Sequence, residues 1–437
     1  MIRFHWPGQP VWTGWQKWLF RFLLIYFLLY IAPWTWISLI PYGEVLLQPY
    51  YTVTDWLVRA ANQWIFRRWD ELVPINGSGD TSFAWTQLWL YLSLSAVIAL
   101  IWSIFSRRSR HYNGLAYWMR QILRYTVAMN CFGYGIIKLF GLQMYYPSLS
   151  QLATPLGDFL PMRLSWMFMG YSFTYQAFSG VMEVVAGLLL LYRRTATAGV
   201  LLAMGVFVNV MMLNFSFDIP VKLFSAHLVL MCVVLLGFEY RRLAAFLTGQ
   251  PADSSQSYQF SFPARWMRIT RIILKLAFVV LVIALPFRDS YERYQQLQAG
   301  EPEGRIRRGI YEVTSFVVNG DTLPPSLSNE ARWSDMIFDY NGVGSVATSD
   351  SIFRQRYHRG YFNYRVDSTG GSVAFTRSSV TGEMTDLFTL ALNVPDSVHL
   401  QLSGRIRRDS VALELRRLPR HFQLTENQFH WLSEYNR

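Results

Sequence analysis

Polar side chains spaced four residues apart occur in three otherwise apolar parts of this sequence: Asn130, Tyr134 and Lys138; Tyr175, Ser179 and Glu183; and Asn214, Asp218 and Lys222. Residues with this spacing share one face of an α-helix. A charged side chain at the centre of a membrane costs about 2.5–3.5 kcal/mol on insertion scales, so it needs a partner, a path to water or a function. Convergence of the three faces would create one polar pocket inside a helical bundle.

Glu183 is the least able of these residues to reach water. It lies about eleven residues into its apolar stretch, which is roughly 16 Å deep at about 1.5 Å per residue. We expect either a protonated carboxyl or an ion pair with Lys138 or Lys222. A lysine in such a place could act as a base or bind a quinone or an acidic head group, and His227 could pass protons. We therefore predict Glu183, Lys138 and His227 as catalytic residues.

Six polar residues are predicted to bind a ligand: Tyr134, Tyr175, Asn209, Asn214, Asp218 and Lys222. Several of the candidate residues also have a purely structural interpretation. Lys138 could snorkel to the outer interface, and Asp218, two residues before Pro220, could be a helix N-cap. His227 could be a hydrogen-bonded packing residue, and the two asparagines could tie helices together.

Membrane helices must position these residues. The chain has 437 residues, of which 52% are hydrophobic and 16% charged, and the shortage of charge falls in the first two thirds. Such a composition is rare in water-soluble proteins, whereas windows of about 20 apolar residues can cross a hydrocarbon core of about 30 Å. We predict about seven spans, at 15–40, 84–106, 115–141, 172–192, 195–215, 221–240 and 267–287.

The basic residues indicate how these spans are oriented. The net charge is +12, but the basic residues collect in short stretches between apolar runs, which is typical of topology signals and not of a nucleic-acid interface. With seven spans, most of these stretches share the N-terminal side, which is then the cytoplasm. We predict contact with the lipid bilayer and none with nucleic acid. In the loop at 41–81, residues 53–69 suit a helix that lies in the interface plane or packs on the bundle.

After residue 287 the apolar runs end and a strand pattern begins. Alternation with period two occurs at 310–318, 334–340, 344–349, 361–367, 372–376, 387–393, 399–403 and 411–415. Turn pairs such as Asn319-Gly320 and Asn341-Gly342 separate many of these segments. We predict an extracytoplasmic all-β domain over 306–437, folded as a small up-and-down, lipocalin-like barrel.

Four segments carry a resemblance to a known family: 134–138 (YGIIK), 168–172 (FMGYS), 178–183 (FSGVME) and 214–222 (NFSFDIPVK). Over about residues 115–245 the chain resembles the DoxX/DoxD-like membrane proteins. The endings FHW at 429–431 and EYNR at 434–437 are similar to longer Bacteroidetes-type members, which also close with a β-domain. The resemblance implies a four-helix bundle in a bacterial inner membrane, in a family linked to thiol redox chemistry and quinone-coupled oxidation. A second similarity, to the membrane region of vitamin-K-dependent carboxylases, implies a lysine base at Lys138.

The signals together divide the chain into four regions: an N-terminal two-span region at 1–114, a DoxX-like bundle at 115–245, a cytoplasmic linker with the last span at 246–290, and the β-domain at 306–437, which is periplasmic in a bacterium. The two cysteines, Cys131 and Cys232, stand in separate apolar stretches and form no CxxC pair. Direct dithiol exchange and a Cys/His metal site are therefore not expected.

Three functions remain open at this point. The leading hypothesis is a membrane protein that binds a small lipophilic or redox-active molecule, with a quinone as the possible cofactor, and supports an oxidoreductase process. The second is a non-catalytic carrier or scaffold whose region 306–437 binds a periplasmic protein. The third is a carboxylase-like enzyme that uses Lys138 as a base.

Overall fold

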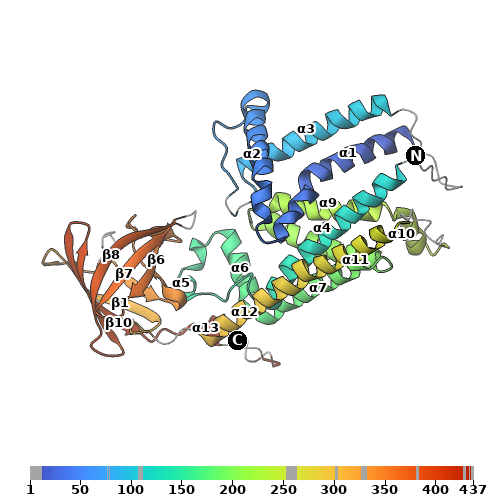
Figure 1. Ribbon diagram of the computed structural model, residues 1–437. Helices are drawn as coiled ribbons and strands as arrows, with labels where there is room; N and C mark the ends of the chain where they lie inside the picture. Colours follow the sequence, from blue (N-terminus) through green and yellow to red (C-terminus); the bar gives the residue numbers. More distant parts are fainter. Residues whose placement is uncertain are drawn as a thin grey trace. The chain divides into compact units, whose positions relative to one another are not determined.

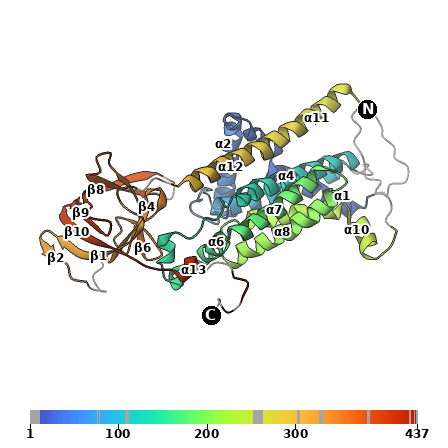
Figure 2. The same ribbon diagram turned by 90° about the horizontal axis from the view of Figure 1, so that it is seen from below.

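The computed structural model describes residues 12–75, 77, 79–106, 112–251, 263–300, 304–325, 332–379, 383–426, 430–432 and 434. The chain forms two compact units. The helical unit takes Met1–Met144 and Ser172–Gln295, and the β unit takes Tyr145–Tyr171 and Gln296–Arg437. Figures 1 and 2 label their elements. The short segment 145–171 therefore belongs to the β unit, although it connects two helices of the helical unit.

The long helices of the helical unit lie where the apolar stretches predict them. They are α1 (Gly14–Ile31), α3 (Ser82–Phe105), α4 (Asn113–Leu139), α7 (Phe173–Leu191), α8 (Ala196–Ser216), α9 (Lys222–Gly237) and α11 (Arg265–Val279), which continues through a π-turn into α12 (Leu285–Ala299). Between α1 and α3 lies α2 (Gly43–Ala61), and α10 (Tyr240–Leu247) follows α9. Helix α2 covers much of the predicted interfacial segment 53–69.

Five helical segments in the described part of the chain are long and apolar enough to cross a membrane: Gly14–Leu39, Ser82–Phe105, Phe173–Leu191, Ala196–Ser216 and Arg265–Ala299. The pair α9 and α10, bent by 77°, raises the number to six if it is one span. The protein is therefore membrane-associated. Helix α4 has 27 residues but carries Arg120, Arg124 and Lys138, so its composition alone does not mark it as a span. The count of seven stays a prediction.

Two glycines bring α4 and α7 into close contact. A Cβ atom added to Gly180 on α7 would lie 2.6 Å from the carbonyl oxygen of Gly135 on α4, and one added to Gly135 would lie 3.0 Å from the carbonyl oxygen of Gly180. Neither helix could carry a larger side chain there without moving. Small residues allow such close approach between membrane helices, where packing supplies much of the association energy.

A buried polar centre joins α1 to α3 and to Tyr112, the residue before α4, and it contains no acidic side chain among the described residues. The Arg21 side chain on α1 is buried. Its guanidinium donates to the Tyr112 hydroxyl and, at 2.6 Å, to Ser103 Oγ. It also lies over the rings of Tyr112 and Trp102. Hydrogen bonds and ring contacts thus satisfy this charge in place of an ion pair.

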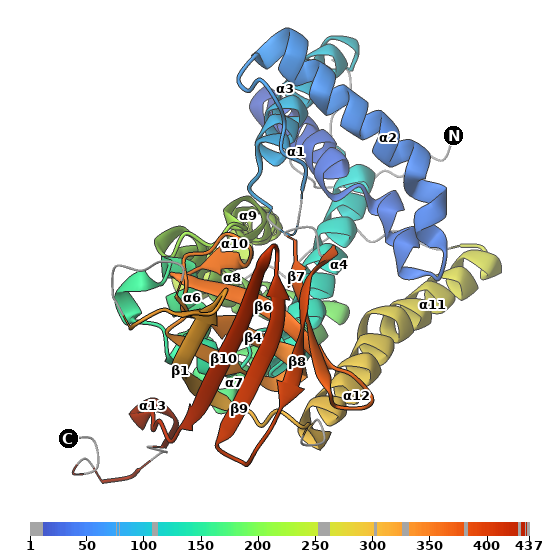
Figure 3. The same ribbon diagram turned by 90° about the vertical axis from the view of Figure 1, so that its left-hand side faces the viewer.

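The β unit contains a closed antiparallel barrel of eight strands: β1 (Gly309–Val318), β3 (Asp335–Phe338), β4 (Val343–Val346), β6 (Arg359–Val366), β7 (Ser372–Ser378), β8 (Met384–Asn393), β9 (His399–Ile406) and β10 (Asp409–Leu418). Each strand pairs with the next along this series, and β10 pairs back with β1. Figure 3 shows the long strands β9 and β10 beside each other. Two short strands, β2 (Asp321–Thr322) and β5 (Arg354–Arg356), add to β1 and β6. The predicted up-and-down barrel is confirmed.

Aromatic side chains pack the interior of the barrel. Phe338, Phe353, Phe362 and Phe375 are fully buried, and the rings of Phe362 and Phe375 lie 5.2 Å apart. Trp333 packs edge-on against Phe353. A lipocalin barrel holds a ligand at its centre, whereas these rings occupy that space here. The lipocalin-like comparison therefore extends to strand number and order and not to an internal ligand cup.

The segment 145–171 packs on the barrel through short helices, α5 (Leu149–Leu152) and α6 (Pro161–Tyr171). Three hydrogen bonds join the two parts: Leu149 N to Asp339 Oδ2 at 2.7 Å, Ser345 Oγ to Ser150 Oγ at 2.8 Å, and Arg163 Nε to the Tyr357 hydroxyl at 3.1 Å. The first two contacts are buried or partly buried, so water competes with them poorly. The segment that connects α4 to α7 is thus part of the β unit.

Substitution of Gly180 by alanine tests the close approach of α4 and α7. We expect Gly180→Ala to lower the free energy of unfolding by about 1–3 kcal/mol, because the new methyl group overlaps backbone atoms of α4. Gly133→Ala on α4 is the control, since a Cβ there meets nothing within 4 Å. Unfolding in mixed micelles, followed by circular dichroism, measures both. Equal losses in the two variants would contradict the described packing.

Candidate functional site

A buried ion pair joins α4 to α7. Lys138 Nζ lies 2.5 Å from Glu183 Oε1, and the two residues are only 4% and 1% exposed. The structure thus selects the ion pair between these two residues from the alternatives that the sequence left open. It also contradicts snorkelling by Lys138, because the ammonium turns toward a carboxylate inside the unit and not toward the interface.

The pair owes its geometry to the glycines that precede each partner by one helical turn. Gly135 stands before Lys138 and Gly180 before Glu183, so the two backbones approach closely at this level. A Cβ on Gly180 would lie 2.9 Å from Lys138 Cβ, and one on Gly135 would lie 3.0 Å from Glu183 Cβ. The side chains therefore begin close together and meet without extending toward solvent. Neighbouring Ile136 is also buried, which keeps the local dielectric low and strengthens the attraction.

One carboxylate oxygen of the pair has no hydrogen-bond partner among the described residues. Glu183 Oε2 is buried and accepts no hydrogen bond from any described residue. A lysine ammonium has three N–H donors, and the Lys138 ammonium uses one of them toward Glu183 Oε1. Unsatisfied buried polar atoms are uncommon and costly. The pair therefore retains both a donor and an acceptor function for a further polar group.

Three other predicted ligand-binding residues are exposed, and one of them, Tyr134, is close enough to Glu183 to interact with it electrostatically. Tyr134 is 38% exposed, with its ring 6.1 Å from that of Phe224 on α9. Tyr175 is 49% exposed, and Asn209 is exposed on α8. In a membrane helix such positions face lipid or a partner, and a shared periodicity with a buried residue does not bring them inward. Their role in ligand binding stays a prediction.

His227 belongs to a different contact, between α9 and α1. Its Nε2 is hydrogen-bonded to the Tyr26 hydroxyl, and its Nδ1 lies 2.6 Å from the carbonyl oxygen of Leu223. Because a carbonyl only accepts, Nδ1 carries the hydrogen and Nε2 of the neutral ring accepts from Tyr26. The Tyr30 ring stacks on the imidazole at 3.8 Å. These contacts match the hydrogen-bonded packing role that the sequence left open.

The third polar group lies at the start of α9, and its key residue was missed. Asp80, between α2 and α3, accepts from the backbone N–H groups of Lys222 at 2.7 Å and Leu223 at 2.9 Å, so it caps this helix. Asp218 does not, which corrects its assignment as the N-cap. Asp218 has a left-handed φ of 49°, and its exposed carboxylate pairs with Lys222 Nζ at 2.7 Å. No local signal could reveal Asp80, because it acts 142 residues away in sequence.

Asn214 closes the turn between α8 and α9. Its backbone carbonyl accepts from Ile219 N at 2.9 Å, and its side-chain amide donates to the Val221 carbonyl oxygen at 3.5 Å. It thus ties helices together, as one of the two interpretations predicted. Within the described residues, the predicted polar faces form three contact groups, around Glu183, His227 and Asp80, and not one pocket.

A double-mutant cycle tests the ion pair. Lys138→Met or Glu183→Met alone should cost about 3 kcal/mol of unfolding free energy, because each leaves an uncompensated charge in the interior. The double variant should lose less than the sum of the two. The control cycle uses Lys222 and Asp218, whose pair is largely exposed on the Asp218 side and should contribute about 0–1 kcal/mol. Additive losses at 138 and 183 would show that the two residues do not interact.

Comparison with known proteins identifies a bacterial relative of this chain. No family model matches the chain, and no solved structure matches it. Over 133 residues, which are 30% of this chain and 84% of the relative, the chain is 33% identical to the uncharacterized protein YwoB of Bacillus subtilis (strain 168). That description names no activity. An identity of this size over most of the relative shows that the chain belongs to the same family as YwoB.

Proposed function

We propose that this protein is a DoxX-like integral membrane protein that binds the polar group of a small lipophilic or redox-active molecule at Lys138 and Glu183. A quinone is the candidate ligand, and the process supported is a membrane oxidoreductase reaction. The proposal rests on the buried ion pair, in which Glu183 Oε2 has no hydrogen-bond partner among the described residues. Ionisable residues inside membrane helices are costly and commonly functional.

The chemistry of the pair suits both redox forms of a quinone. A quinone carbonyl accepts hydrogen bonds, and the Lys138 ammonium has donors beyond the one used by Glu183. A quinol hydroxyl donates, and Glu183 Oε2 is a buried acceptor. The pair would orient the ring and exchange protons with it, while a separate redox protein would supply or remove the electrons. Proton exchange at a positioned carboxylate is ordinary acid–base chemistry.

The same geometry disfavours the carboxylase-like alternative. A general base needs a lone pair, and an ammonium held at 2.5 Å by a carboxylate has none. Lys138 would first have to transfer its proton to Glu183 and then leave it. We therefore place Lys138 in the binding role.

The β unit supports a seven-span topology. Segment 145–171 and the barrel form one compact unit, so the number of membrane crossings between them must be even. Helices α7, α8 and α11–α12 provide three crossings, and α9 supplies the fourth that parity requires. Counting α1, α3 and α4 before the segment then gives seven. We propose a bacterial inner-membrane location with a cytoplasmic N-terminus and a periplasmic barrel.

A non-catalytic scaffold is the second candidate, and one observation favours it. The barrel interior is filled by aromatic side chains, so the domain offers its outer surface and rim for recognition. In that function, region 306–437 would bind a periplasmic protein and the ion pair would only fix α4 against α7. Full activity in cells of a variant with Lys138, Glu183 and His227 all neutralised would favour the scaffold.

Quinone retention during purification tests the binding proposal. We expect wild-type protein to carry extractable quinone, and Glu183→Gln to carry about tenfold less, because the amide cannot form the charged pair or accept a proton. Asp218→Asn makes the same chemical change at an exposed position and should retain wild-type levels. Liquid chromatography of solvent extracts, normalised to protein, measures all three. Equal quinone content in every variant would overturn the proposal.

A further inference from the structure

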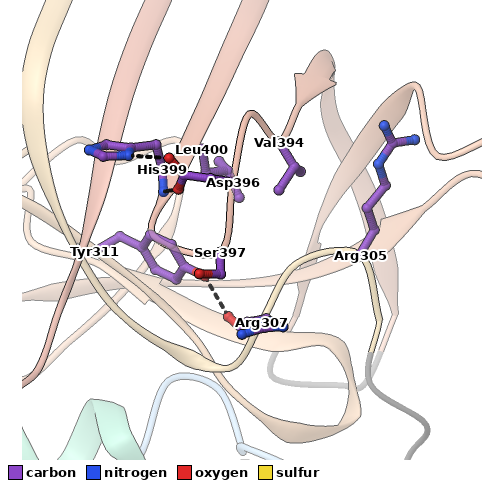
Figure 4. A pocket seen from close by; sticks show the side chains of 8 residues that line it. All are labelled: Arg305, Arg307, Tyr311, Val394, Asp396, Ser397, His399 and Leu400. Atoms are coloured by element: carbon purple, nitrogen blue, oxygen red, sulfur yellow. Dashed lines mark hydrogen bonds and ion pairs between the residues drawn. The ribbon is translucent and has the colours of Figure 1, made fainter.

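A cavity at one end of the barrel stands apart from the buried ion pair. Its volume is about 200 Å³, and it lies between the segment that leads into β1 and the loop that joins β8 to β9. Figure 4 shows the side chains that line it, among them Arg305, Arg307, Tyr311, Ser397 and His399. In Figure 4, Arg307, Tyr311 and Ser397 lie together, whereas the Arg305 guanidinium and the His399 ring point away from them on opposite sides. The lining nevertheless includes two arginines. Such a lining favours a negatively charged ligand.

The first guanidinium is held by neutral groups. Arg305 Nη1 donates to the carbonyl oxygens of Gly370 at 2.8 Å and Thr369 at 3.4 Å. Gly370 permits this approach, because a Cβ there would lie 2.3 Å from Arg305 Nη1 and its φ is +72°. Carbonyl oxygens orient a guanidinium without neutralising it. Arg305 therefore keeps its positive charge beside the cavity, although its guanidinium is directed toward the turn at Thr369 and Gly370.

The second guanidinium is unengaged within the part of the chain that the structure describes. Arg307 contributes its backbone carbonyl, which accepts from the Tyr311 hydroxyl at 2.8 Å. Tyr311 is 3% exposed. Burial raises the pKa of Tyr311, and the nearby cations Arg417 and Arg307 act against that rise, so the phenol lies in a positive field.

The carboxylate of Asp396, the acidic residue that lines the cavity, forms its hydrogen bonds within its own loop. Its Oδ1 accepts from the backbone N–H groups of Val398 and His399, each at 2.7 Å, and its Oδ2 lies 2.9 Å from His399 Nδ1. Hydrogen bonding from the His399 side chain, then from the backbone, lowers the pKa of Asp396 to about 2. This carboxylate therefore builds the loop that forms one wall. It does not pair with Arg305 or Arg307.

We propose that this cavity binds a phosphate group, with Arg307 as its charged donor and Ser397 as a neutral one, while Arg305 adds positive charge from the wall of the cavity. Arginine suits phosphate because its planar fork donates two parallel hydrogen bonds. The volume of about 200 Å³ leaves space for a substituent on the phosphate. The phosphate belongs either to a free solute or to the head group of an anionic phospholipid. This site is independent of Lys138 and Glu183, so either proposal can fail alone.

Calorimetric titration of inorganic phosphate into the full-length protein tests the site. The protein is placed in nanodiscs of phosphatidylcholine, with chloride replaced at constant ionic strength. We expect saturable binding that Arg307→Gln weakens by at least about tenfold, since a charged hydrogen-bond donor is lost. Arg307 has no side-chain partner among the described residues, so the variant should fold. Arg408→Gln, in the turn between β9 and β10 at the other end of those strands, is the charge-matched control and should bind as wild type.

Nanodiscs that contain phosphatidylglycerol distinguish the two sources. Unchanged phosphate binding in these discs supports a free solute as the ligand, and loss of binding in wild type supports a lipid head group that already fills the cavity. Absence of saturable binding in phosphatidylcholine discs would overturn the proposal. So would equal weakening by Arg307→Gln and Arg408→Gln.

Discussion

The ion pair between Lys138 and Glu183 is the interaction on which the helical unit depends most. The opposite charges of Lys138 and Glu183 compensate each other inside the bundle, and their contact requires the backbones of α4 and α7 to lie close together. Gly135 and Gly180 provide that closeness. The close packing of α4 on α7 and the ion pair therefore depend on each other: the glycines allow the approach that the ion pair requires.

The same two helices are joined by a segment that belongs to the β unit. Residues 145–171 leave α4 and return to α7, and their short helices bond to Asp339, Ser345 and Tyr357 of the barrel domain. The helices that carry the ion pair are thus covalently continuous with a segment held by the β-domain. Residues 145–171 and the barrel, which are far apart in sequence, therefore belong to one compact unit.

Local patterns predicted the elements well and the long-range contacts poorly. Each of the eight barrel strands overlaps a segment of period-two alternation, because one face of a barrel strand is buried and the other is not. The depth of Glu183 in its apolar stretch led to the alternatives of a protonated carboxyl or an ion pair with Lys138 or Lys222, and the structure shows the pair with Lys138. Asp80 as the cap of α9, and Arg21 as a buried centre, were not predicted, because their partners lie far away in sequence. Periodicity places a residue on a face of a helix, but the partner of that face depends on how the helices pack.

Photo-crosslinking with a light-activated quinone analogue tests the central claim most directly. The protein in native-like membranes is illuminated with the analogue, digested, and mapped by mass spectrometry. We expect labelled peptides to cluster on α4 and α7 around Lys138 and Glu183, unlabelled quinone to compete with the labelling, and Glu183→Gln to abolish it. Labelling confined to the lipid-exposed face of α11, or unaffected by Glu183→Gln, would contradict a quinone site at the ion pair and leave the pair as a structural clamp.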